Sequence, residues 1–288
     1  MTIPIPEARR FYADELKFST AMRSRALHAA FAAAPRERFL GPGPWRIKSP
    51  WRLDRYWTTD DADPRNVYHN VLIALDESLG LNNGLPGLWA FLFDRLAVTL
   101  GESVTHLGCG TGYYTAILAE LVGPTGKVKA IDIHPEIAGR AHAALAPWPQ
   151  VVVAHGDGSA AALEPSDILV ASAGATHPPS AWLAALAPGG RLLFPMTATE
   201  GPGGMLLVKR GRKDEFSASF LCPVEFYQFS GARDPAVSER LATALRHDRG
   251  ASVKSLRCDA HQEDETCWLH GKGWCLSRRE RPLRTSLK

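Results

Sequence analysis

A turn between a predicted strand and a predicted helix carries glycine at every second position, in residues 108–112 (Gly-Cys-Gly-Thr-Gly). Glycines at such a turn permit positive φ and let the backbone approach a ligand without a Cβ atom in the way. The helix that begins at Tyr113 offers free N–H groups and the positive end of its dipole to a polar ligand. The next apolar segment, 127–131, is followed by Asp132, whose carboxylate can accept hydrogen bonds from both hydroxyls of a ribose. These residue types and this spacing predict a site for a nucleoside.

Alternating strands and helices must position these residues. Apolar runs such as 151–153 and 168–171 predict parallel strands that are covered by helices on both faces. Strands are predicted at 103–107, 127–131, 150–154, 167–172 and 190–195, and helices at 113–122, 135–145 and 179–187. This alternation predicts an α/β protein with a doubly wound, mostly parallel sheet and right-handed crossovers. Ligands bind such sheets beyond the carboxyl ends of the strands. The sequence places four polar or glycine residues at such ends: Gly108, Asp132, Asp157 and Ser172.

The segments that flank this core have a different character. Residues 7–34 are alanine-rich and predicted to be helical, whereas 41–66 is irregular and rich in proline, tryptophan and aspartate. Beyond the core, antiparallel strands are predicted at 205–208 and 220–229, a helix at 235–247, and short strands at 252–258, 266–269 and 273–276. The predicted organisation is an N-terminal helical and lid-like segment (1–66), a ligand-binding core (67–212) and a small C-terminal β-containing extension (213–288).

Composition and charge narrow the class of protein. The 288 residues carry a net charge of +3, with 45% hydrophobic and 22% charged residues, which is typical of a globular protein and does not indicate a nucleic-acid surface. Five cysteines, far apart in the sequence, do not form a disulfide pattern, which favours a reducing setting. The N-terminus lacks the pattern of a signal peptide, and no apolar run reaches the ~20 residues needed to span a bilayer. We therefore expect a cytoplasmic protein with no nucleic-acid or membrane partner.

Several motifs, in order, resemble those of protein L-isoaspartyl O-methyltransferases. They are Pro35-Arg36-Glu37-Arg38-Phe39, Tyr68-His69-Asn70, the run from His106 to Val122, Gly156-Asp157-Gly158, and Pro188-Gly189-Gly190-Arg191-Leu192 followed by Pro195. The resemblance covers residues 20–212 and is more specific than the glycine turn, which by itself indicates only the Rossmann-like methyltransferases. It implies the doubly wound fold of that superfamily and an enzyme that transfers a methyl group from S-adenosylmethionine.

The resemblance also implies a role for the residues of the cofactor site. The three glycines would line the methionine part of S-adenosylmethionine, Asp132 would hold the ribose, and Asp157 would face the adenine. The expected cofactor-binding residues are Gly108, Cys109, Gly110, Thr111, Gly112, Tyr113, Asp132, Ile133, Gly156, Asp157, Gly158 and Ser172.

The acceptor region departs from the family pattern. Gly84 stands where the family has a serine or threonine near the transferred methyl group, and Asn70 stands where it has an aspartate. The cofactor half of the site is kept and the acceptor half is altered, which favours a specialised peptide substrate over general repair of isoaspartyl residues. The candidate catalytic residues of this region are Tyr68, His69, Asn83 and Gly84.

The chemistry leaves more than one acceptor open. A carboxylate is ionised at neutral pH and needs no base, so O-methylation of a carboxylate in a protein or peptide is the favoured reaction. A hydroxyl or amine of a small molecule would need a general base, for which His69 is the nearest candidate. A third alternative is a protein that binds the cofactor without turnover.

A metal site is a further alternative in the C-terminal extension. Cys267-x-x-His270, together with Cys275 and Cys258, offers four residues of the types that bind zinc. This spacing fits no standard zinc pattern, and buried cysteines commonly act as small apolar residues. We therefore expect no metal.

Overall fold

Two compact units make up the chain. In this computed structural model the first unit is formed by Met1–Glu102 and Cys109–His155, and the second by Ser103–Gly108 and Gly156–Lys288. The structure describes residues 3–159, 162–211 and 215–280. Within those ranges, no helix combines the length and the apolar character needed to cross a membrane.

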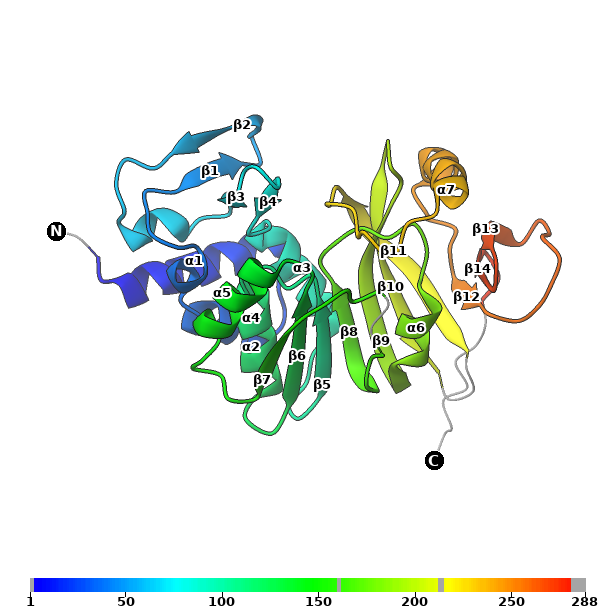
Figure 1. Cartoon of the computed structure of the whole chain (residues 1–288), viewed down its shortest axis with the longest axis horizontal. Coiled ribbons are helices and arrows are strands. Elements are labelled where there is room, and N and C mark those ends of the chain that lie inside the picture. The colour runs from blue at the N-terminus through cyan, green and yellow to red at the C-terminus, as the bar shows by residue number, and fades with distance from the viewer. Residues whose placement is uncertain (1–2, 160–161, 212–214, 281–288) are drawn as a thin grey trace. The chain divides into compact units, whose positions relative to one another are not determined.

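Helices and a small antiparallel sheet form the N-terminal part of the first unit (Figure 1). The helices are α1 (Ile5–Thr20), α2 (Arg25–Ala33) and α3 (Pro86–Leu96), with the short 3-10 helices η1 (Arg36–Phe39) and η2 (Pro64–Val67). The strands are β1 (Arg46–Ser49), β2 (Arg52–Thr58), β3 (Leu72–Asp76) and β4 (Leu81–Asn82), in the order β2-β1-β3-β4. Tyr12 and Phe31 are buried and meet edge to face, so α1 and α2 share one apolar core.

Two expectations for this part differ from the structure. The predicted helix over 7–34 is interrupted at Ala21, which adopts a left-handed conformation with φ 51°. Ser24 then begins α2, since its hydroxyl accepts a hydrogen bond from the Leu27 N–H at 3.1 Å. The segment 41–66, predicted to be irregular, contains the β1–β2 hairpin, which β3 extends through antiparallel pairing with β1.

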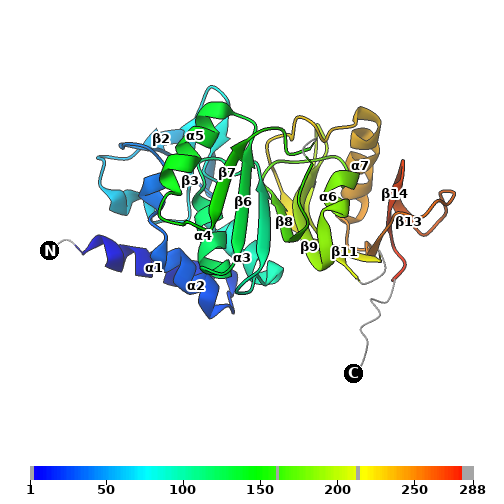
Figure 2. The ribbon, with the colours of Figure 1, turned by 60° about the horizontal axis from the view of Figure 1, so that its bottom comes forward.

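The remainder of the first unit has the predicted alternation of helix and strand. It contains α4 (Tyr113–Val122), β6 (Lys127–Asp132), α5 (Pro135–Ala144) and β7 (Val151–His155). Strands β6 and β7 pair in parallel, from Val128 opposite Val151 to Asp132 opposite His155. Helix α4 packs on β6, and α5 packs on both strands (Figure 2). The predicted bounds of these elements are therefore confirmed to within one residue.

The second unit contains a mixed sheet. Its elements are β5 (Ser103–Leu107), β8 (Ser166–Ala171), α6 (Ser180–Ala184), β9 (Leu186–Thr197), β10 (Gly203–Arg210), β11 (Phe216–Val224), α7 (Pro235–Asp248), β12 (Ser255–Arg257), β13 (Cys267–Gly271) and β14 (Trp274–Ser277). The strand order is β13-β14-β12-β11-β10-β9-β8-β5. The pairs β5–β8 and β8–β9 are parallel, and every pairing from β9 to β13 is antiparallel.

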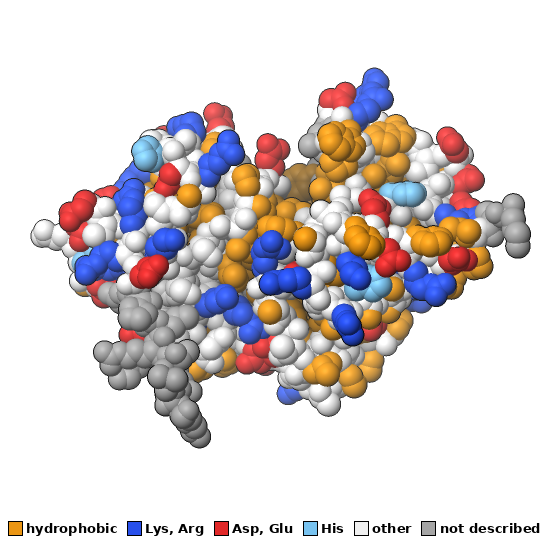
Figure 3. Space-filling view, turned by 180° about the vertical axis from the view of Figure 1, so that it is seen from behind, with side chains coloured by type: hydrophobic (Ala, Val, Ile, Leu, Met, Phe, Trp, Pro, Cys, Tyr) orange, Lys and Arg blue, Asp and Glu red, His pale blue; other side chains and the backbone are white. Residues whose placement is uncertain are grey.

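Most of the predicted elements of the second unit are confirmed. Asp234 begins α7 as predicted, because its carboxylate accepts from the N–H groups of Ala236 and Val237. Helix α6 is shorter than predicted, since β9 starts at Leu186 and pairs there with Ser166 of β8. On the face shown in Figure 3, basic, acidic and apolar side chains of the described residues are interspersed.

Candidate active site

The glycine turn joins the end of β5 to α4, and its residues from Cys109 onward lie in the first unit. Gly110 has φ +57° and Gly112 has φ +97°, conformations that other residues adopt only with strain. A Cβ atom on Gly112 would lie 2.7 Å from Leu145 Cδ1, whereas one on Gly110 would have its nearest neighbour at 3.9 Å. Gly112 is therefore required for packing, and Gly110 leaves backbone open to a ligand.

Asp132 is the last residue of β6 and lies beside the turn, as predicted. Its carboxylate is buried; Oδ2 accepts from the Gly110 N–H at 2.8 Å, and Oδ1 accepts from the His134 N–H at 3.1 Å. Burial raises the pKa of the Asp132 carboxyl, and the two N–H donors oppose that rise. Because each carboxylate oxygen has two lone pairs, both oxygens keep an acceptor site for a ribose hydroxyl.

Three neighbouring side chains bear on whether a nucleoside cofactor fits here. Among the described atoms, the Thr111 hydroxyl is buried without a hydrogen-bond partner, which a polar ligand at the turn would supply. Ile133 is apolar yet 42% exposed, which offers a hydrophobic surface directly after the acid. Burial raises the pKa of the Cys109 thiol, so this cysteine stays protonated and fills space. The turn therefore fits the cofactor implied by its glycines and its acid.

The second unit holds the other predicted cofactor residues. Gly108 follows β5, and Ser172 follows β8 and accepts or donates a hydrogen bond with His106 Nε2 at 2.8 Å. In the bend after β7, Asp157 Oδ1 accepts from both the N–H and the hydroxyl of Ser159, each at 2.8 Å. Each of these residues lies beyond the carboxyl end of a strand, as predicted.

The bend around Asp157 is fixed from two sides. The carbonyl oxygen of Gly158 accepts from the indole N–H of the fully buried Trp182 at 2.9 Å. A Cβ atom on Gly158 would lie 2.9 Å from Leu107 Cδ2, while Gly156 has open space at that position. In the Gly-Asp-Gly motif, Gly158 is therefore required for packing, whereas Gly156 leaves its backbone open, as Gly112 and Gly110 do in the glycine turn.

The Tyr113 side chain belongs to the core of the first unit. Its hydroxyl lies 3.2 Å from the hydroxyl of Tyr12, and its ring contacts Phe31 and Phe39. A contact of Tyr113 with a ligand at the turn therefore has to come from its backbone.

The predicted catalytic residues all lie in the first unit, and the side chains of two of them are hydrogen-bonded to other side chains. The Tyr68 hydroxyl donates to Glu37 Oε2 and accepts from Arg9 Nε at 3.0 Å. Burial is the main cause that raises the pKa of the Tyr68 phenol. Asn83 is buried, and its Oδ1 accepts from Arg36 Nε at 3.1 Å. His69, by contrast, is exposed.

Arg36 organises this region, a role that the sequence did not reveal. It is fully buried in η1. Besides the bond to Asn83, its guanidinium donates to three carbonyl oxygens, those of Val67 and Val71 at 2.8 Å and that of His69 at 2.9 Å. One side chain thereby holds the chain that leads to Asn70 and the loop before α3. Its signal in the sequence is its place in the Pro35–Phe39 motif.

Gly84 occupies a position that is built for glycine. Its φ is +72°, and a Cβ atom there would lie 2.8 Å from Trp89 Nε1 and 3.1 Å from Tyr114 Cε2. Its N–H donates to Asn82 Oδ1 at 2.8 Å, and its carbonyl accepts from the Tyr114 hydroxyl at 3.1 Å. A serine or threonine at this position would be strained by the positive φ and would be too close to Trp89 in this loop conformation.

Asn70 also has a structural task. Its Oδ1 accepts from the Gly87 N–H at 2.7 Å in the first turn of α3. Since Leu85, the residue before this helix, offers no side-chain cap, Asn70 supplies the missing acceptor from a distant part of the chain.

Comparisons with known proteins agree with this architecture. A family model described as protein-L-isoaspartate(D-aspartate) O-methyltransferase matches residues 52–233. A protein-L-isoaspartate O-methyltransferase 1 of Anaeromyxobacter sp. is 33% identical over 216 residues, which cover 73% of this chain and 91% of that protein. A protein of the same name from Rhodopseudomonas palustris is 30% identical over 235 residues, 81% of this chain and 86% of that protein.

Solved structures share the fold. A putative protein-L-isoaspartate O-methyltransferase from Plasmodium falciparum, in complex with S-adenosyl-L-homocysteine, has a TM-score of 0.62 at 13% identity, covering 77% of this chain and 98% of that one. The chain belongs to the family of protein-L-isoaspartate(D-aspartate) O-methyltransferases, which confirms the resemblance and the Rossmann-like fold predicted from its sequence.

Proposed function

We propose that this protein transfers a methyl group from S-adenosylmethionine to a carboxylate, of the isoaspartyl or aspartyl type, in a protein or peptide. Its family is one of S-adenosylmethionine-dependent methyltransferases, so the predicted enzyme class and cofactor follow from that membership. The single observation that carries the site is the contact between Asp132 Oδ2 and the Gly110 N–H, which joins the predicted ribose acceptor to the glycine turn.

The residues of the turn would hold the cofactor by complementary contacts. S-adenosylmethionine supplies a methyl group on a positively charged sulfur, which is already a strong electrophile. The Asp132 oxygens, one of which accepts from the Gly110 N–H, would also accept from the ribose hydroxyls, and the buried Thr111 hydroxyl would gain a polar partner. The exposed Ile133 side chain gives an apolar contact, and the open backbone at Gly110 permits close approach. The chain's main contribution to catalysis is then to align the acceptor with the methyl group.

The chemistry of the acceptor region favours a carboxylate. The phenol of Tyr68 is engaged by Glu37 and Arg9, and the amide of Asn83 is engaged by Arg36. Gly84 brings no side chain to act on a proton. A carboxylate acceptor is ionised at neutral pH, so it needs none of these groups as a base.

A peptide assay tests the acceptor class. Three peptides of one sequence, carrying isoaspartate, aspartate or asparagine at a single position, are incubated with the protein and methyl-labelled S-adenosylmethionine. We expect label in a base-labile ester on a carboxylate peptide and none on the asparagine peptide. Cofactor binding without label in either carboxylate peptide contradicts the proposal.

Three variants sharpen this assay. Asp132→Ala removes two hydrogen bonds to a charged acceptor, about 1.5 kcal/mol each, so cofactor binding measured by calorimetry weakens about 100-fold. Asp54→Ala, at a carboxylate that is 69% exposed on β2, leaves that affinity unchanged. His69→Ala separates the alternatives, because loss of a general base lowers the rate about 100-fold or more, whereas a carboxylate acceptor leaves the rate unaffected.

A further inference from the structure

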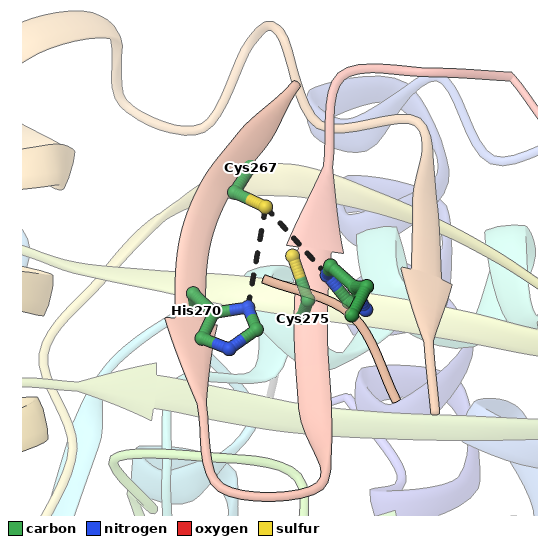
Figure 4. Close-up of side chains that lie close together, drawn as sticks. Cys267, His270 and Cys275 are labelled. Carbon is green, nitrogen blue, oxygen red and sulfur yellow. Dashed lines mark hydrogen bonds between the residues drawn. The ribbon is translucent and has the colours of Figure 1, made fainter. Parts of the chain in front are cut away.

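Four side chains of the metal-binding types converge in the second unit. We call them the Cys2His2 cluster: His261, Cys267, His270 and Cys275. Their potential ligand atoms all lie within 4.8 Å of one another, and both cysteines are buried. Figure 4 shows Cys267, His270 and Cys275 pointing toward one another across the β13–β14 hairpin.

A β-bulge brings the two ligands of β13 to one face. Cys267 and His270 are three residues apart, a spacing that places side chains on opposite faces of a regular strand. The pairing advances two residues from Cys267 to Leu269, while the partner strand advances one, from Ser277 to Leu276. The extra residue restores the phase, so that Cys267 lies on the same face as His270. His270 pairs directly with Cys275, which completes three of the four positions.

Two of the separations in the cluster are close to those of a tetrahedral zinc site, and all of them lie within 4.8 Å. Bond lengths of about 2.3 Å to sulfur and about 2.0–2.1 Å to nitrogen place neighbouring ligand atoms about 3.4–3.8 Å apart. Cys267 Sγ lies 3.6 Å from His261 Nε2 and 4.0 Å from His270 Nδ1. Only a few tenths of an ångström separate these distances from the coordinated geometry.

The surroundings prepare the cluster for a cation. His261 Nδ1 lies 2.8 Å from the carbonyl oxygen of Asp259. Because a carbonyl can only accept, Nδ1 carries the proton and Nε2 presents its lone pair toward Cys267, the arrangement found around zinc-bound imidazoles. The Asp264 N–H donates to Cys267 Sγ at 3.4 Å, and the Asp264 carboxylate, whose Oδ1 lies 3.6 Å from the same sulfur, adds a negative charge that attracts a cation.

We propose that the Cys2His2 cluster binds one zinc ion in a closed, structural site. Two sulfur and two nitrogen donors in a tetrahedral arrangement favour zinc over harder cations. All four positions are taken by protein atoms, which leaves no place for a reacting water and makes the role structural. On binding, the two thiols become thiolates and release two protons to water. The ion fastens the loop that carries His261 to the β13–β14 hairpin.

This site is separate from the family's chemistry. The family model ends at residue 233, before all four ligands. The sequence pointed to a set that included Cys258, which is exposed and outside the cluster, and it did not include His261.

Metal analysis of the purified full chain tests the proposal without any methyl transfer. The protein is expressed with zinc, freed of loosely bound metal by gel filtration, and analysed by mass spectrometry of its elements; we expect about one zinc ion per chain. Cys267→Ser and Cys275→Ser each lose the metal, while Cys258→Ser, which alters a cysteine outside the cluster, retains it.

A second measurement keeps the test decisive if the serine variants do not fold. The wild-type protein is depleted with a chelator, its fold is checked by circular dichroism, and cobalt(II) is added. We expect the visible absorption of tetrahedral cobalt together with sulfur-to-metal charge transfer, and displacement of both by zinc. Absence of zinc from the wild-type protein together with absence of this spectrum refutes the site, as does equal zinc content in Cys258→Ser and Cys275→Ser.

Discussion

Replacing Arg36 by methionine tests whether one buried guanidinium holds the acceptor region together. Methionine keeps the length of the side chain but removes donors to the Asn83 amide and to three backbone carbonyls. Two of those carbonyls belong to the buried residues Val67 and Val71 and lose this donor. At a net value of about 1 kcal/mol or more for each of the four hydrogen bonds, we expect the free energy of unfolding to fall by about 4 kcal/mol or more.

Urea unfolding measures this loss. Tryptophan fluorescence and far-ultraviolet circular dichroism are followed together, so that any separate unfolding of the first unit is detected. The matched control is Arg55→Met, which removes a guanidinium that is 69% exposed and should stay within about 0.5 kcal/mol of the parent. An Arg36→Met variant as stable as the parent refutes the reasoning, because it would mean that desolvation of the charge cancels its hydrogen bonds.

Three further predictions follow from single contacts. Gly84→Ala should lower the free energy of unfolding by about 3 kcal/mol, whereas Gly41→Ala should lower it by about 1 kcal/mol. The two glycines have nearly equal positive φ, but only at Gly84 would the added Cβ atom lie within 3 Å of another atom. Equal losses in urea unfolding would contradict this reasoning. Asn70→Ala removes the acceptor of the first turn of α3 and should cost about 1 kcal/mol, whereas an unchanged urea midpoint would show that solvent replaces the cap. Burial lowers the pKa of His106 to about 3, so the unfolded state binds the extra proton and the free energy of unfolding falls as the pH drops from 6.5 toward 3. His106→Asn should reduce this dependence of the free energy of unfolding on pH, as measured by urea titrations at several pH values. If the variant loses stability as steeply as the parent, other groups are responsible for the dependence.

The sequence predicted those parts of the fold that depend on local chemistry. The glycine turn, the proline and aspartate that begin α7, and the apolar runs of β6, β7 and β8 each carry their own signal, and their bounds agree with the structure. The β1–β2 hairpin was missed because its strands lack an alternating pattern and because β1 also depends on pairing with β3, farther along the chain. Helix α6 was predicted too long because pairing of β9 with β8 at Leu186 overrides helix propensity.

In the candidate sites, too, residues marked by local sequence spacing were predicted, whereas roles that depend on distant contacts were not. Asp132 was predicted because its spacing from the glycine turn is a property of the sequence, and the structure brings it to the Gly110 N–H. The role of Arg36 depends on four acceptors 31 to 47 residues away, which no local pattern encodes. The sequence named three members of the Cys2His2 cluster, namely Cys267, His270 and Cys275. It took Cys258 in place of His261, because His261 lies in a loop where no spacing pattern marks it.

The bulge in β13 makes the proposed zinc site depend on a single codon. Trp268 lies in the bulged segment, where its indole N–H donates to Asp248 Oδ1 at 2.8 Å and its ring meets Phe220 at 5.3 Å. Deleting Trp268 would straighten the strand and turn Cys267 away from His270, although all four ligands would remain in the sequence. A lineage could therefore gain or lose this metal by one in-frame insertion or deletion, and a search for zinc patterns that counts only the ligands would not notice.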